Sequence, residues 1–115
     1  MRPFEEVAVN FASALVAGDF DRARGYLLPA LQVHFSANEL RNCLFGMFDG
    51  YASGPPTAIE FDDEFSLLDW PSRQPTDVGW AYVSIVGDGF VEAVSVTVTD
   101  VDGSNFIREI EWGRP

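Results

Sequence analysis

The spacing of apolar residues changes once along the chain and divides it into a helical part and a sheet part. In the first half they recur every three or four positions, the period of a helix with one buried face. This spacing predicts helices over residues 3–17, 20–27 and 37–51. After the breaker-rich residues 50–56, apolar and polar residues alternate with the period of a strand. Strands are expected near residues 57–69, 78–87, 90–101 and 105–113.

This order predicts an α+β fold, with three N-terminal helices packed on a four-stranded antiparallel sheet and no helix after Pro56. The segment 57–69 reads either as one strand or as a bent pair of strands. The dipeptides Asp88-Gly89 and Asp102-Gly103 lie between the last three strands. Asp-Gly favours two-residue type I′ hairpin turns, in which both central residues have positive φ. At 115 residues, the chain is expected to be one domain, residues 1–115.

The two turns also predict which residues share a face of the sheet. They place Val83 opposite Val94, and Val98 opposite Ile107. One face is then mostly aliphatic, with Ala81, Val83, Ile85, Val94, Val96, Val98 and Ile107. The other face mixes aromatic, polar and charged residues, namely Trp80, Tyr82, Ser84, Ser95, Thr97, Thr99, Phe106, Arg108, Ile110 and Trp112. Because both faces carry many apolar groups, we expect a cover on each side.

The segment from Phe11 to Pro29 resembles the opening of NTF2-like domains, which include ketosteroid-isomerase and polyketide-cyclase-like proteins. In these domains a helix ends in Ala-Gly-Asp, here residues 17–19, and a short helix follows. The Asp102-Gly103 hairpin leading to a terminal Trp112 also matches. The resemblance covers nearly the whole chain and implies a curved sheet that forms a cone, with a pocket between sheet and helices. The mixed face of the sheet offers such a pocket from its residues alone, because the small residues of its middle strand, flanked by aromatics, leave room for a ligand. The candidate pocket residues are Phe11, Tyr26, Trp80, Tyr82, Ser95, Thr97, Arg108 and Trp112.

The catalytic groups of the isomerase are absent from the corresponding positions of this chain. The position of the isomerase's catalytic tyrosine corresponds to Phe11, and that of its carboxylate base to Phe35 or a neighbour. The position of its protonated acid lies near Ser95. His34 is the nearest titratable side chain to the base position. We therefore favour a non-catalytic ligand-binding or protein-interaction domain, and the alternative is a small-molecule enzyme of the cyclase, isomerase or dehydratase type with His34 as general base.

Arg108 and the aliphatic face suggest further partners. The Arg108 guanidinium would pair with a carboxylate, so the pocket is expected to take a small apolar or carboxylate ligand, unless Arg108 pairs with an acidic neighbour. The resemblance turns Trp112 toward the helices and leaves the aliphatic face outward. An exposed aliphatic patch of that size predicts a homodimer through the outer sheet face.

The charge balance narrows the classes of partner. Eighteen acidic residues oppose seven arginines, with no lysine, for a net charge of −11. Such a charge repels nucleic acids and anionic membranes, and it favours either simple solubility or a basic protein partner.

Metal and cofactor chemistry finds little support in the sequence. One histidine and one cysteine, Cys43, do not make a closed zinc site or an intrachain disulfide. The acidic run over residues 60–64 is interpreted as a solvated strand face or bend. No cofactor or metal is expected. Without a signal peptide or an apolar span, a cytoplasmic location is expected.

Overall fold

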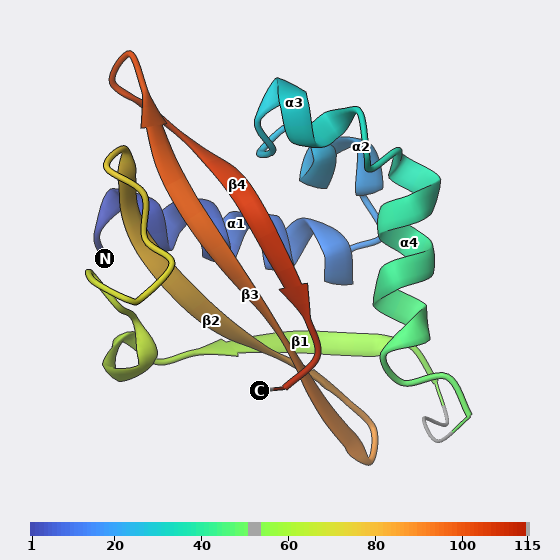
Figure 1. Ribbon diagram of the computed structural model, residues 1–115. Helices are drawn as coiled ribbons and strands as arrows, with labels where there is room; N and C mark the ends of the chain where they lie inside the picture. The colour runs from blue at the N-terminus through green and yellow to red at the C-terminus, as the bar shows by residue number, and fades with distance from the viewer. Residues whose placement is uncertain (51–53, 115) are drawn as a thin grey trace.

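The computed structural model describes residues 1–50 and 54–114, which form an α+β fold with a four-stranded antiparallel sheet in the order β1-β2-β3-β4 (Figure 1). The helices are α1 (Pro3–Val16), α2 (Phe20–Arg24), α3 (Pro29–Gln32) and α4 (Ala37–Gly46). The strands are β1 (Pro56–Phe61), β2 (Asp77–Gly87), β3 (Phe90–Val101) and β4 (Ser104–Trp112), and a 3-10 turn, η1 (Asp63–Phe65), follows β1. The predicted α+β class is confirmed.

Two predicted helices are shorter in the structure than the apolar spacing suggested. The second ends at Arg24, because the backbone of Tyr26 and Leu28 turns to pair with β4: the Ile107 N–H donates to the Tyr26 carbonyl at 2.8 Å. The short helix α3 follows, beginning at Pro29, where a missing N–H costs nothing. The helix predicted over residues 37–51 ends at Gly46 in the structure, and its last predicted residue lies outside the described residues.

The predicted strand 57–69 is interrupted. β1 ends at Phe61, and Asp62 caps η1 by accepting a hydrogen bond from the Glu64 N–H at 2.9 Å. The expectation of no helix after Pro56 is therefore wrong for this one 3-10 turn. The chain returns to the sheet at Leu67, which forms an isolated antiparallel bridge with Trp80. This arrangement is closer to the bent pair of strands than to a single strand.

Both hairpins have the predicted register. Val83 pairs with Val94, and Val98 pairs with Ile107. At the second turn Asp102 and Gly103 have φ values of 53° and 87°, as a type I′ turn requires. At the first turn only Gly89 has a positive φ, 78°, so the type I′ prediction is wrong there and the positive φ falls where a type II turn has it.

The aliphatic face of the sheet packs on the helices, so the predicted orientation of the faces is wrong. Figure 1 shows α1 behind the strands, along one face of the sheet. The largest fully buried side chains come from both layers: Phe11, Leu15, Leu27, Leu40, Leu44, Ile85, Ile107, Glu5, Val83, Val94, Val96 and Val98. Because these valines form the core, they are not the outer apolar patch on which the homodimer prediction depended.

A β-bulge explains part of the error. The pairing of β3 with β4 shifts between Thr97 and Val98, so that Thr97 pairs with Glu109 but Val98 pairs with Ile107. Arg108 is the extra residue, and beyond it the alternation of β4 is inverted. Ile110 and Trp112 therefore pack against the core with the valines, rather than on the opposite face as the uninterrupted alternation predicted.

Candidate interaction surface

The face of the sheet turned away from α1, here called the outer face, carries a hollow lined mainly by apolar side chains. Its residues are Glu64, Phe65, Leu67, Trp80 and Tyr82, and its volume is about 370 Å³. We call these five residues the aromatic groove. Trp80 and Tyr82 come from β2, Glu64 and Phe65 come from η1, and Leu67 comes from the segment that follows η1.

Backbone pairing and ring contacts position the groove. Leu67 and Trp80 exchange two backbone hydrogen bonds, each of 2.9 Å, which hold the segment after η1 against β2. The Phe65 ring lies 5.8 Å from the Tyr82 ring, and the Tyr82 ring lies 6.4 Å from that of Trp80. The three rings form a continuous aromatic row beside β2.

Large apolar side chains beside β2 remain in contact with solvent. Phe65 is 56% exposed, Leu67 is 41% exposed and the adjacent Leu68 is 56% exposed. Single exposed apolar residues are ordinary, but a contiguous group next to a hollow is typical of an interaction site. This group lies beside the sheet and is exposed, whereas the residues of the aliphatic face are buried.

Glu5, in the first turn of α1, fastens the groove segment to the helix layer. Its carboxylate accepts hydrogen bonds from the Arg2 side chain and backbone, and from the Ser66 hydroxyl at 2.7 Å. The hydrogen bonds from Arg2 lower the pKa of Glu5 to about 2, against the opposing effect of burial and with help from Ser66. Since Ser66 lies between Phe65 and Leu67, this bond holds the rim of the groove in place.

Glu5→Gln should destabilise the protein by about 1–2 kcal/mol at pH 7, because hydrogen bonds to a charged group are replaced by weaker neutral ones. The folded-state pKa lies below the ordinary value of 4.5, so the stabilisation is complete above pH 4.5 and is lost as the pH falls toward 2. Urea denaturation at a series of pH values should show the wild-type advantage shrinking over that window. Glu6→Gln, which removes the same charge from an exposed neighbour, is the control. An advantage over Glu5→Gln that is independent of pH would contradict the assignment.

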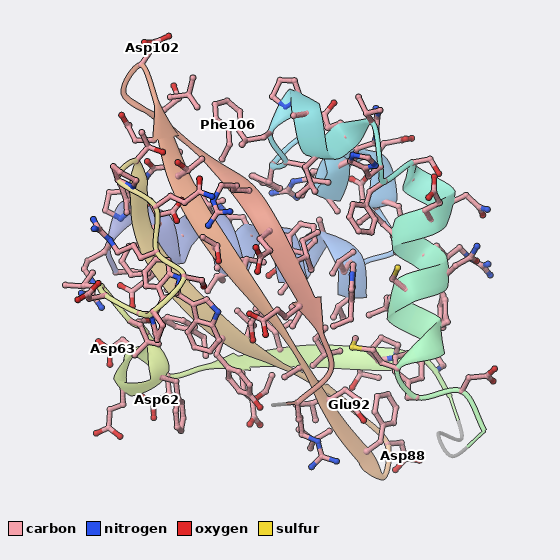
Figure 2. All side chains as sticks on the ribbon, viewed as in Figure 1. Asp62, Asp63, Asp88, Glu92, Asp102 and Phe106 are labelled. Atoms are coloured by element: carbon pink, nitrogen blue, oxygen red, sulfur yellow. The ribbon has the colours of Figure 1, made fainter. Side chains whose placement is uncertain are left out.

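The outer face around the groove carries several carboxylates, of which Glu109 lies 3.7 Å from the Arg108 guanidinium. Glu60, Glu109 and Glu111 are exposed, and their strand partners Ser84, Thr97 and Ser95 lie on the outer face. Figure 2 shows Asp62 and Asp63 at the turn that follows β1. Across residues 1–50 and 54–114, no cluster of three or more His, Cys, Asp or Glu is arranged to hold a metal ion. The surroundings of the groove are acidic without forming such a cluster.

Arg108, the extra residue of the β4 bulge, is already paired with carboxylates. Its guanidinium donates two hydrogen bonds to the Asp77 carboxylate, at 2.9 and 2.8 Å, and the Asp77 side chain is fully buried. Burial alone would raise the pKa of Asp77, but the hydrogen bonds from Arg108 and from the Gln74 N–H outweigh it and keep this pKa below its ordinary value. Arg108 therefore neutralises an internal carboxylate, as the alternative interpretation of the sequence had it.

Long side chains also close over the small residues of β3. Trp80 on β2 donates from its indole N–H to Glu111 on β4 at 3.4 Å, across the strand that carries Ser95 and Thr97. These two are only 2% and 3% exposed. The space that the sequence suggested for a ligand above β3 is thus occupied by the protein's own side chains.

The remaining residues of the predicted pocket lie on the other side of the sheet. Phe11 is fully buried, Tyr26 packs against the core, and the Trp112 ring lies 6.4 Å from Phe11 and 6.5 Å from Phe35. The Trp112 indole N–H is buried without a hydrogen-bond partner among the described residues. The eight predicted pocket residues therefore do not line one site. Trp80 and Tyr82 reach the aromatic groove, Ser95 and Thr97 are buried on the outer face, and Arg108 is held by Asp77. Phe11, Tyr26 and Trp112 are in or against the core.

His34 and Cys43, the candidate reactive side chains, lie in the helical layer. His34 is exposed, next to α3, and its backbone N–H donates to the Leu31 carbonyl. Cys43 is half-buried on α4, and burial together with the nearby Glu39 raises its thiol pKa, which disfavours a reactive thiolate. Neither side chain lines the aromatic groove.

Comparison with protein-family models, with curated proteins and with solved structures finds no match for this chain. Among its described residues, none of the helices combines the length and the apolar character needed to cross a membrane.

Phe65, Leu67 and Glu64 are the groove residues that sequence reasoning missed. A signal for them was present: apolar Phe65, Leu67 and Leu68 stand directly after the acidic run, within the segment 57–69 whose alternation predicted a strand. Apolar residues beside such an acidic run either pack in the core or contact a partner.

Proposed function

We propose that this protein is a non-catalytic interaction domain whose outer face binds a basic segment of another protein. The observation that carries the proposal is the aromatic groove: three rings and a leucine in contact with solvent, beside Glu64 and within an acidic outer face. Aromatic faces attract cations, and the surrounding carboxylates add longer-range attraction. A partner rich in arginine and lysine complements both features.

Homodimerisation through the outer face is the competing proposal. With the faces corrected, it would place two aromatic grooves against each other. Each chain carries a net charge of −11, so the pairing would bring two acidic surfaces together, whereas a basic partner gains from the same charges. Sedimentation velocity should therefore show a monomer, and a concentration-dependent dimer that Phe65→Ala dissociates would favour the homodimer instead.

Membership of the NTF2-like superfamily remains a proposal. Its support is the order of elements, with helices first and the antiparallel sheet after them, together with the quoted segment from Phe11 to Pro29. The small-molecule enzyme is not favoured by any contact described above, because His34 is exposed and lies apart from the groove. A small carboxylate ligand is disfavoured in the same way, since Arg108 is engaged by Asp77.

The binding proposal predicts a measurable, salt-dependent affinity for basic peptides. The probe is a glycine–serine dodecapeptide with three arginines and three lysines, compared by calorimetry with the same peptide carrying glutamine at those six positions. The basic peptide should bind and the glutamine peptide should not, and raising the salt from about 50 to 300 mM should weaken binding several-fold, because screening shortens the reach of the charges. Phe65→Ala, at a 56% exposed position, should weaken binding about two- to fivefold, the value of one exposed cation–π contact.

Two controls distinguish the groove from a general attraction to acidic protein. Val33→Ala shortens an apolar side chain that is 80% exposed in the helical layer, and His34→Ala removes the candidate base. Both variants should bind the basic peptide as the wild type does. Equal binding of the basic and glutamine peptides, or a loss on His34→Ala with none on Phe65→Ala, would overturn the proposal.

A further inference from the structure

We propose that the group seated in the aromatic groove is an arginine side chain of the partner, in preference to lysine. This inference rests on the proposed function and assigns the chemistry of its central contact. In the proposed contact, a planar guanidinium stacks on the rings of the groove and has a carboxylate within reach of its N–H donors.

The shape of the groove favours a flat cation. Trp80, Tyr82 and Phe65 follow one another as a row, with interplanar angles of 34° between the first pair and 53° between the second. A row of tilted rings offers broad faces to a planar group, rather than a closed cage around a spherical ammonium. Guanidinium stacks on aromatic faces and loses less hydration than an ammonium when it does so.

The carboxylates nearby suit the same group. Glu64 lines the groove itself, and Glu60 lines the adjoining hollow with Phe65 and Tyr82. A guanidinium presents five N–H donors in a plane, so it remains stacked on the rings while it donates to a carboxylate at its edge. Lysine, with a compact and strongly hydrated ammonium, does not satisfy both contacts in one geometry as readily.

The protein uses the same combination elsewhere on its surface. The Arg2 guanidinium lies 5.0 Å from the centre of the Phe4 ring while its N–H groups donate to Glu5. Arg41 lies 5.0 Å from the centre of the Phe45 ring. In the groove the rings and the carboxylates come from this chain, and the guanidinium would come from the partner.

The test uses three glycine–serine dodecapeptides that differ at six positions, which are all arginine, all lysine or all citrulline. Citrulline keeps the planar shape of arginine and lacks its charge. The arginine peptide should bind about five- to tenfold more tightly than the lysine peptide, because only the guanidinium stacks on the rings while it donates hydrogen bonds to a carboxylate. The citrulline peptide should show no saturable binding at millimolar concentration.

Two groove variants identify the source of the preference. In Phe65→Ala and in Trp80→Ala the arginine-to-lysine ratio should fall below about twofold, the remainder being charge attraction. Trp80→Ala also loses the contact with Glu111. If that loss reduces the stability of the protein, the result for Phe65→Ala decides the question. In the wild type, the indole N–H resonance of Trp80 should shift on titration with the arginine peptide, while that of Trp112, in the core, should not.

The outcomes separate this inference from the proposed function. If arginine and lysine peptides bind equally and both depend on Phe65, the arginine preference is wrong and the basic-partner function stands. If neither cationic peptide binds, both are wrong. If the arginine preference persists in Phe65→Ala, the guanidinium is bound elsewhere and the groove assignment is overturned.

Discussion

Val96→Glu should unfold the protein. Val96 is 1% exposed on β3, pairs with Ala81 on β2 and Ile110 on β4, and belongs to the core cluster that includes α1. A carboxylate at this position has no cation to pair with among the core side chains, and burying an unpaired charge costs several kcal/mol. Domains of this size have a total stability of about 5–15 kcal/mol, so one such charge removes much or all of it.

The measurement is circular dichroism with thermal denaturation, and Val91→Glu is the matched control. Val91 is a valine on the same strand but is 45% exposed, so the glutamate there stays in water and the melting temperature should change by only a few degrees. A folded Val96→Glu protein would show that the aliphatic face does not form the core. If the wild type were a dimer and Val96→Glu a folded monomer, the valines would face outward, as the sequence analysis predicted.

Arg108→Met should have the second largest effect, a loss of about 3–5 kcal/mol, because it leaves the buried Asp77 carboxylate without its cation. Both partners are anchored: Arg108 is the extra residue of the β4 bulge, and Asp77 also accepts a hydrogen bond from the Gln74 N–H at 2.8 Å. The Arg73 guanidinium, at 2.9 Å, reaches only the Asp77 carbonyl oxygen and does not replace Arg108.

Urea denaturation at several pH values distinguishes a lost charge pair from lost packing. The lowered pKa of Asp77 means that the pair contributes its stability above the ordinary value of 3.8 and loses it as the pH falls. The deficit of Arg108→Met should therefore shrink on acidification, when its unpaired carboxyl takes up a proton. The double variant Asp77→Asn with Arg108→Met should recover part of the loss, and Arg114→Met, at a side chain 62% exposed, should be nearly neutral. A deficit that is constant with pH would assign Arg108 a packing role only.

The sheet was predictable from sequence up to the bulge, because local turn chemistry determines strand register. The Asp-Gly pairs placed Val83 against Val94 and Val98 against Ile107, as the structure has them. Counting two residues per repeat through β4 then failed, since one bulged residue inverts every later side chain. The three-residue spacing of Ile107 and Ile110 was the available sign of that bulge.

The candidate site was less predictable, because it depends on contacts between distant segments. Trp80 and Tyr82 could be placed on one face of β2 from alternation alone. Their neighbours Phe65 and Leu67 could not, since a 3-10 turn and a single backbone bridge return them to the sheet. The pairing of Asp77 with Arg108, 31 residues apart, likewise depends on three strands meeting in the folded sheet.

The most direct test of the central claim is to map where a basic peptide binds, by following backbone amide resonances of the labelled protein during titration with the arginine dodecapeptide. We predict saturable shifts concentrated at residues 64–67 and 80–82, with smaller ones at the neighbouring residues 109–111 of β4. Residues of α3 and the adjacent His34 should remain unchanged. Shifts confined to that helical region, or spread over the acidic surface without saturation, would contradict the assignment of the outer face as the interaction surface.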